Sequence, residues 1–103
     1  MSQIENVTIL KEANVYFDGG CVSYTLLLPD GTKKSVGVIL PATHTFGTAA
    51  PEIMELVKGS CRVRLAGEGA WADYTAGQEF RVPGDSSFEI EVTETLHYVC
   101  HYG

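Results

Sequence analysis

The sequence predicts an all-β fold of about eight to ten strands, either a sandwich or a closed barrel, in one domain over residues 1–103. Helix signals are nearly absent, and short apolar or alternating runs are separated by turn residues at fairly even spacing. Between two of these runs, Asp30-Gly31 is a strong hairpin signal. A chain of many short strands without crossover helices protects its sheet edges by closing the sheet or by adding a second one.

The individual strands follow in chain order from the turn residues between them. Residues 14–40 predict three strands joined by Asp-Gly-Gly and Pro-Asp-Gly turns, and residues 41–51 predict an irregular connector. A strand over 51–58 is expected to end in a turn at Gly59-Ser60. The remaining segments are a strand at 61–67, a hairpin tip or short strand at 68–77, and strands at 78–84, 86–94 and 96–103.

The composition argues against several kinds of partner. The formal net charge is −6 with only seven Lys and Arg residues, so the sequence is a poor candidate for binding nucleic acid or an anionic membrane. The N-terminal segment lacks the pattern of a signal peptide, and no apolar run is long enough for a membrane span. Cys21, Cys61 and Cys100 have no metal-binding spacing, which is typical of reduced, partly buried thiols. We therefore expect a cytoplasmic protein.

Residues 52–57 place a carboxylate on an otherwise apolar strand face. In a strand, alternate side chains share a face, so Glu52 points the same way as Met54 and Leu56. A carboxylate that faces an apolar interior is costly unless it is paired or used in function. Glu52 is therefore the first candidate for a functional residue.

Two spacings around this strand resemble the two motifs of the cupin barrels. Six residues separate Glu52 from Gly59, and five separate Gly77 from Pro83. Cupins usually add three histidines to the glutamate, and together these side chains hold a divalent metal. Here only His44 remains, because Phe46 and Phe88 stand where the other two imidazoles are expected. Two protein ligands do not make a tight site for a transition metal, so no functional metal is predicted.

Longer stretches resemble the small pyrimidine/purine nucleoside phosphorylase family over about residues 15–102. They are "VYFDGG", "SVGVILPATHTFGTAAPEIMELVKG", "YTAGQEFRVPGDSSFEIEV" and "YVCHY". The most specific parts are Thr-x-x-Pro-Glu-x-Met at 48–54 and Ala-Gly-x-x-Phe-x-Val-Pro-Gly at 76–84. The resemblance implies a one-domain cupin-type barrel or jelly roll. It also implies phosphorolysis of nucleosides to a free base and ribose 1-phosphate over a broad range of bases, with phosphate as co-substrate and no other cofactor.

The implied reaction suggests two catalytic residues. Glu52 would hold the ribose hydroxyls and stabilise the positive charge that develops on the sugar; alternatively it only binds backbone amides of the 43–49 segment. His44 would act as an acid or as a hydrogen-bond donor to phosphate, because its pKa lies near neutrality; alternatively it has no task at the barrel mouth.

The substrate-binding candidates are less specific. Phe46 and Phe88 should line the cavity and stack on a base of any identity, although plain core packing is the alternative for either ring. Arg81 is the cationic candidate, but alternation points it away from the face of Phe80 and Val82. Hydroxyl groups complete the set, at Thr48, Tyr98 and Tyr102. Tyr98 and Tyr102 share one strand face with Cys100, whereas His97 and His101 share the other, and either face could look inward.

Two other functions fit the same sequence. A cavity with one glutamate and two phenylalanines would serve equally well in a non-catalytic cupin that binds a small metabolite. A metal-dependent cupin enzyme would need ligands from unforeseen places such as His97 or His101. In either case we expect a homodimer, since pairing buries an exposed sheet, and residues 1–12 could form a helical turn or an arm on the partner subunit.

Overall fold

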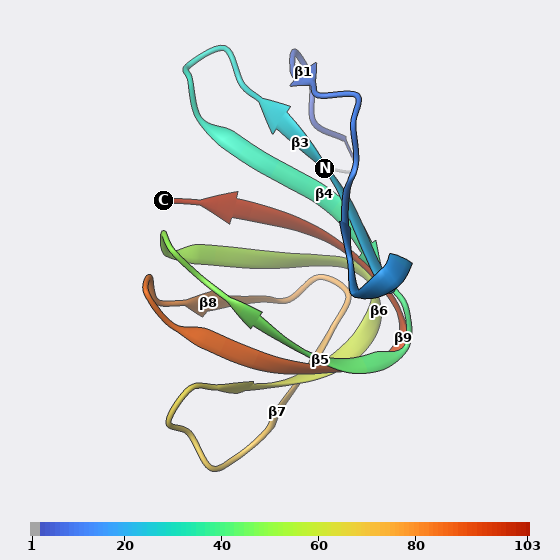
Figure 1. The fold of residues 1–103 in the computed structure, drawn as a ribbon, viewed down its shortest axis with the longest axis vertical. Coiled ribbons are helices and arrows are strands. Elements are labelled where there is room, and N and C mark those ends of the chain that lie inside the picture. The colour runs from blue at the N-terminus through green and yellow to red at the C-terminus, as the bar shows by residue number, and fades with distance from the viewer. Residues whose placement is uncertain (1–2) are drawn as a thin grey trace.

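The computed structural model describes residues 3–103 and contains one antiparallel sheet of nine strands (Figure 1). One short 3-10 turn, η1, is its only helical element in that range. The elements are β1 (Thr8–Ile9), β2 (Asn14–Tyr16), η1 (Phe17–Gly19), β3 (Cys21–Leu27), β4 (Lys33–Ile39), β5 (Ala42–Gly47), β6 (Glu52–Leu65), β7 (Ala72–Thr75), β8 (Glu79–Val82) and β9 (Ser87–Tyr102). The all-β prediction is confirmed, and the number of strands lies in the predicted range.

The long strands β6 and β9 organise the sheet. The main order is β1-β3-β4-β9-β6-β7, with β2 paired to β3, β5 to β9 and β8 to β6. The first half of β9 pairs with β5, its second half pairs with β4, and β6 pairs with β9 along most of its length. Both strands curve strongly across the molecule, so the sheet bends over on itself (Figure 1). Over residues 3–103 its hydrogen-bonded ladders do not close into a ring.

The predicted turn at Gly59-Ser60 is wrong. Residues 52–65 form one strand of 14 residues, in which the pairing with β9 shifts register between Leu56 and Cys61. Gly59 has a φ of +99°, and a side chain there would collide with the backbone oxygens of Glu94 and Thr95 in the neighbouring strand. A glycine in a strand often marks such a bulge, which bends the strand without ending it.

The irregular connector predicted at 41–51 is also wrong in part, because Ala42–Gly47 is strand β5. It pairs with the first half of β9, and Phe46 lies opposite Phe88. Thr43, Thr45 and Phe46 are residues that favour strands, and pairing with β9 supplies the partner that the local sequence does not reveal. The predicted strands at 86–94 and 96–103 are likewise one strand, β9.

The core lies on the inner side of the bend. Ile39, Leu56, Ile90 and Leu96 are almost completely buried there. Cys21, Cys61 and Cys100 are free and buried, as predicted.

Residues 8–10 pair with β3 of the same chain, whereas residues 1 and 2 of the predicted helical turn or arm lie outside the described residues. Strand β1 pairs with β3, and Thr8 lies opposite Leu27. No helix within residues 3–103 is long and apolar enough to cross a membrane.

Candidate active site

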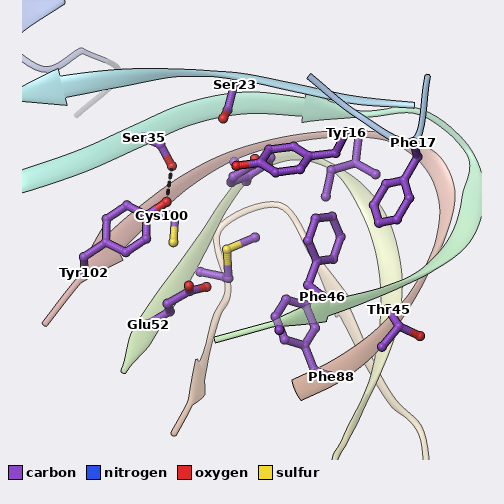
Figure 2. Close-up of a pocket in the computed structure, with 14 residues that line it drawn as sticks. Tyr16, Phe17, Ser23, Ser35, Thr45, Phe46, Glu52, Phe88, Cys100 and Tyr102 are labelled. Atoms are coloured by element: carbon purple, nitrogen blue, oxygen red, sulfur yellow. Dashed lines mark hydrogen bonds between the residues drawn. The ribbon is translucent and has the colours of Figure 1, made fainter. Parts of the chain in front are cut away.

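A pocket of about 250 Å³ opens inside the bend of the sheet (Figure 2). Residues of η1 and of strands β2 to β6 and β9 form the wall of the pocket, so both halves of the bent sheet contribute to it. The lining residues are Tyr16, Phe17, Ser23, Ser35, Ile39, Thr45, Phe46, Gly47, Glu52, Met54, Phe88, Tyr98, Cys100 and Tyr102. Polar side chains gather at one end and aromatic rings at the other (Figure 2).

Glu52 stands at the polar end (Figure 2). Buried Met54, two residues further along β6, lines the same pocket. Burial raises the pKa of the Glu52 carboxyl, while a hydrogen bond with the Cys100 thiol and the charge of Lys33 lower it. Burial also raises the pKa of Cys100 to about 12, with a further increase from the charge of Glu52. The carboxylate therefore lies in a half-buried site where negative charge is costly, as expected for a group that receives a cation or hydroxyl groups of a ligand.

Hydroxyl groups line the same pocket as this carboxylate. The Tyr102 hydroxyl lies 3.0 Å from Ser35 Oγ, and burial raises the pKa of Tyr102 to about 12. Deeper in the pocket, the Tyr98 hydroxyl lies 3.5 Å from the Cys21 thiol, and burial raises its pKa as well. These hydroxyls stay protonated at neutral pH and can donate to a ligand oxygen.

Gly37 makes room for Tyr98. A Cβ at Gly37 would lie 2.9 Å from the Tyr98 hydroxyl and 2.6 Å from the backbone oxygen of Val22. Any larger residue at position 37 would push the Tyr98 phenol out of its position. A glycine at this point of β4 is therefore required by the shape of the pocket floor.

The opposite end of the pocket is a cluster of rings (Figure 2). Phe46 stacks on Phe88 at 5.6 Å between ring centres and 20° between planes. Phe17 approaches Phe46 edge-on at 5.3 Å, and Tyr16 does so at 6.3 Å. Tyr16 and Phe17 remain nearly half exposed, so part of each ring surface is free to contact a flat ligand.

The turn that carries Phe17 is strained. Phe17 and Asp18 have φ values of +53° and +54°, in the left-handed region that side-chain-bearing residues seldom adopt. The His44 ring stacks on Phe17 at 4.0 Å and 7°, and its Nε2 is buried without a hydrogen-bond partner in the described part of the chain. This stacking holds the strained turn against the aromatic end of the pocket.

The structure brings together five of the eight residues predicted from the sequence. Glu52, Phe46, Phe88, Tyr98 and Tyr102 all line the pocket. The Cys100 thiol lines the pocket with Glu52 and offsets part of the burial-driven rise in the pKa of the Glu52 carboxyl. In the described chain the side-chain hydrogen bonds found for residues 43–49 are those of Thr48 to Pro83 and Ser86, and none joins the Glu52 carboxylate to a backbone amide there.

The other three predicted residues lie outside the lining. His44 sits behind Phe17, because its position in β5 turns it toward η1. Thr48 Oγ1 donates to the Pro83 carbonyl at 2.7 Å and accepts from Ser86 N at 3.0 Å, so it joins two loops. Arg81 is 75% exposed on the outer face, as alternation indicated, with Glu79 3.9 Å away. These three residues therefore do not line the pocket, and their predicted part in the reaction stays a prediction.

Several lining residues were not predicted. Ser35 and Ser23 belong to runs without motif spacing, and Tyr16 and Phe17 lie beside an apparent turn. The aromatic pair next to Asp-Gly-Gly was the one signal in the sequence that could have indicated a pocket wall, because large rings exposed in a turn often contact a ligand or a partner.

The residues at hand do not form a metal site of the cupin type. Glu52 faces inward, whereas His97 and His101 line a cavity on the outer face of the same sheet. His44 lies behind Phe17 and is absent from the lining. Within residues 3–103, no three His, Cys, Asp or Glu side chains gather as metal ligands.

Known proteins resemble this chain closely. The family model described as pyrimidine/purine nucleoside phosphorylase matches residues 11–102. A relative of that name from Cupriavidus pinatubonensis is 65% identical, covering 100% of this chain and 98% of its own. A solved protein of unknown function from Acinetobacter sp. ADP1 is 48% identical with a TM-score of 0.97, and 100% of each chain is covered.

A more distant structure bears on the fold alone. Ectoine synthase from P. lautus is 20% identical, with a TM-score of 0.66 over 79% of this chain and 62% of that one. Its likeness supports a cupin-like all-β fold. From the family match and the full-length identity, this chain belongs to the pyrimidine/purine nucleoside phosphorylase family.

Proposed function

We propose that this protein catalyses the phosphorolysis of nucleosides in the pocket that contains Glu52. The relatives' name supports the reaction class. The observation that carries the proposal for this chain is a half-buried carboxylate at the polar end of a pocket whose other end is aromatic. A nucleoside has the same two-part character, with a hydroxylated sugar joined to a flat base.

In this proposal the base lies among the rings of Phe17, Phe46 and Phe88, and the ribose lies beside Glu52. Phosphate attacks the anomeric carbon, C1′, from the side opposite the base. The bond between C1′ and the base nitrogen breaks, its electron pair leaves with the base, and a new C1′–O bond to phosphate forms. The sugar carries positive charge as these bonds exchange, and the Glu52 carboxylate stabilises that charge.

Broad base specificity follows from how the base would be held. Stacking on aromatic faces depends little on which groups the base carries, whereas hydrogen-bond recognition separates bases sharply. The aromatic end offers mainly ring surface from Tyr16, Phe17, Phe46 and Phe88. We therefore expect purine and pyrimidine nucleosides to react at rates within about one order of magnitude of each other.

The test is incubation of the purified protein with uridine or adenosine, with and without inorganic phosphate. The proposal expects free base and ribose 1-phosphate only when phosphate is present. Base release without phosphate would indicate a hydrolase. Tight nucleoside binding with no release in either case would favour the second candidate, a non-catalytic metabolite-binding cupin, which the same pocket would also suit.

We propose that the bent sheet functions as one cupin-type barrel domain around the pocket.

We also propose a homodimer formed through the outer face of β3, β4, β9 and β6, because a large apolar surface favours self-association. Val22, Val36, Val57 and Val99 line a cavity of about 720 Å³ there together with Ile4 and Val7, and Val57 is 52% exposed whereas Val99 is buried. Sedimentation analysis would return a monomer if this is wrong.

A further inference from the structure

The proposed reaction needs a place for phosphate, and no cationic side chain lines the pocket in the described chain. Phosphate is largely dianionic at neutral pH, and burying such charge without a cation or hydrogen-bond donors is very costly. The nearby cations therefore decide where phosphate could bind.

Most of the cations face away from the pocket. Arg62 and Arg64 form ion pairs with glutamates on the outer surface, and in each pair a guanidinium nitrogen lies 2.5 Å from a carboxylate oxygen. Both guanidinium groups also lie over the Trp71 ring. Arg81 is exposed on the outer face. Lys34 Nζ lies 2.5 Å from His101 Nδ1, also on the outer face.

Lys33 is placed differently. It precedes Ser35 by two residues in β4, so both side chains extend from the inner face of the strand. Its Nζ lies 4.8 Å from the centre of the Tyr102 ring, which lines the polar end. Lys33 takes part in none of the ion pairs found among residues 3–103.

Three neighbouring strands therefore present a row of groups at the polar rim. Glu52 in β6 lies opposite Tyr102 in β9, and β4 with Lys33 and Ser35 flanks β9 on its other side. Burial raises the pKa of Glu52, and the charge of Lys33 offsets part of that rise, which agrees with the position of Lys33 at this rim.

We propose that Lys33, together with the hydroxyl groups of Tyr102 and Ser35, binds inorganic phosphate at the polar rim of the pocket. The inference rests on the proposed function for its role in catalysis, but the anion site itself can be measured separately. The ammonium group supplies charge, and the two hydroxyls can turn from each other to donate to phosphate oxygens. Phosphate held there lies at the opposite end from the aromatic rings, so the attacking group and the leaving base flank the sugar from two sides.

The test compares Lys33→Gln with Lys34→Gln, which removes the same charge one residue away on the opposite face. In Lys33→Gln we expect the KM for phosphate to rise about tenfold or more, with the KM for the nucleoside changed less than about twofold. Lys34→Gln should leave both values within about twofold of the wild type, and Lys33→Arg should keep most of the phosphate affinity. A phosphate KM in Lys33→Gln within about twofold of the wild type would overturn the inference while leaving phosphorolysis intact.

A second measurement does not depend on turnover. Inorganic phosphate is titrated into the wild type and the Lys33→Gln variant, and binding is followed by broadening of the phosphate resonance in ³¹P NMR. Binding to the wild type that is lost in Lys33→Gln supports the anion site even if no base is released. Equal binding in both proteins, or none to the wild type, contradicts it. The thermal unfolding midpoint of each variant establishes that the protein is folded.

Discussion

The inner and outer faces of β4, β9 and β6 carry two polar clusters of similar composition, and they differ in how their groups are used. On the outer face Lys34 donates to His101 Nδ1, and His101 Nε2 donates to Glu55 Oε1 at 2.9 Å. Each group there has a partner within the cluster. On the inner face Glu52 is half-buried, and burial raises the pKa of its carboxyl, while the Cys100 thiol and the charge of Lys33 offset part of that rise. Among residues 3–103 it forms no ion pair.

This difference shows which cluster is suited to a ligand. On the partly exposed outer face the polar groups already bond to one another, so few donors or acceptors there are available to a ligand. A desolvated carboxylate without a strong partner gains most when a ligand supplies hydroxyl groups or positive charge. The same strands therefore separate a structural polar cluster from a functional one simply by alternation.

The largest expected effect sharpens this comparison with a matched pair of substitutions. Glu52→Gln keeps the shape of the side chain and removes its charge, and we expect kcat to fall about a hundredfold or more, the scale of losing one electrostatic contact to the transition state. Glu55→Gln makes the same change on the outer face and should leave kcat within about twofold of the wild type. The comparison fails if Glu52→Gln keeps full turnover and only lowers the melting temperature.

The next effect concerns the aromatic end. Phe46→Leu keeps an apolar side chain but removes the ring that stacks on Phe88. Because base stacking contributes about 1–3 kcal/mol, the KM for adenosine and for uridine should both rise about tenfold. Tyr24→Leu on the exposed outer face is the control. A rise for one nucleoside alone would mean that Phe46 selects the base, contrary to the proposal of broad specificity.

A smaller effect is expected at the polar rim. Tyr102→Phe removes the hydroxyl that pairs with Ser35 and keeps the ring. A net hydrogen bond is worth about 1 kcal/mol, so kcat/KM for phosphate should fall about fivefold. Tyr24→Phe on the outer face should have no measurable effect. Steady-state kinetics with phosphate as the varied substrate gives both values, and equal values in the two variants would remove Tyr102 from the anion site.

The smallest effect is on stability. Burial raises the pKa of Glu52 above its ordinary 4.5 in the folded protein, so the folded state binds the proton more tightly than the unfolded state does. The free energy of unfolding should therefore fall as the pH rises from 4.5 through the raised folded pKa, and stay lower above it. The Glu52→Gln variant has no carboxyl group to ionise at this site, so its free energy of unfolding should not fall in this way. It should therefore unfold at a higher temperature than the wild type at pH 7. Urea denaturation across this pH range would show parallel curves for both proteins if Glu52 carried no such cost.

More of the inward-facing residues than of the strand boundaries could be predicted from the sequence. Strand alternation identified Glu52 as inward-facing with Met54, and the cupin spacing identified Phe46 and Phe88 as cavity residues. Alternation alone also placed Arg81 away from the interior. These predictions succeed because they depend on local periodicity and on short motif spacings, both of which are contained in the chain itself.

The remaining features depend on contacts between distant segments. Strand β5 exists because β9 supplies its partner, and the bulge at Gly59 bends β6 where the local residues suggest a turn. His44 was expected to act as an acid or phosphate donor, or to have no task at the barrel mouth. Its ring stacks on Phe17, which lies in a turn with two left-handed residues. The Asp-Gly-Gly turn itself was predicted, but no pattern in a single sequence reveals the left-handed backbone of Phe17 or the ring that packs against it.

The most direct test of the account is a crystal structure of this protein with ribose 1-phosphate bound. The account predicts that the ribose hydroxyls contact the Glu52 carboxylate, that the phosphate lies at the Lys33 and Tyr102 rim, and that the space beside Phe46 remains for a base. A ligand bound on the outer face, or a Glu52 side chain turned out of the pocket, would contradict it.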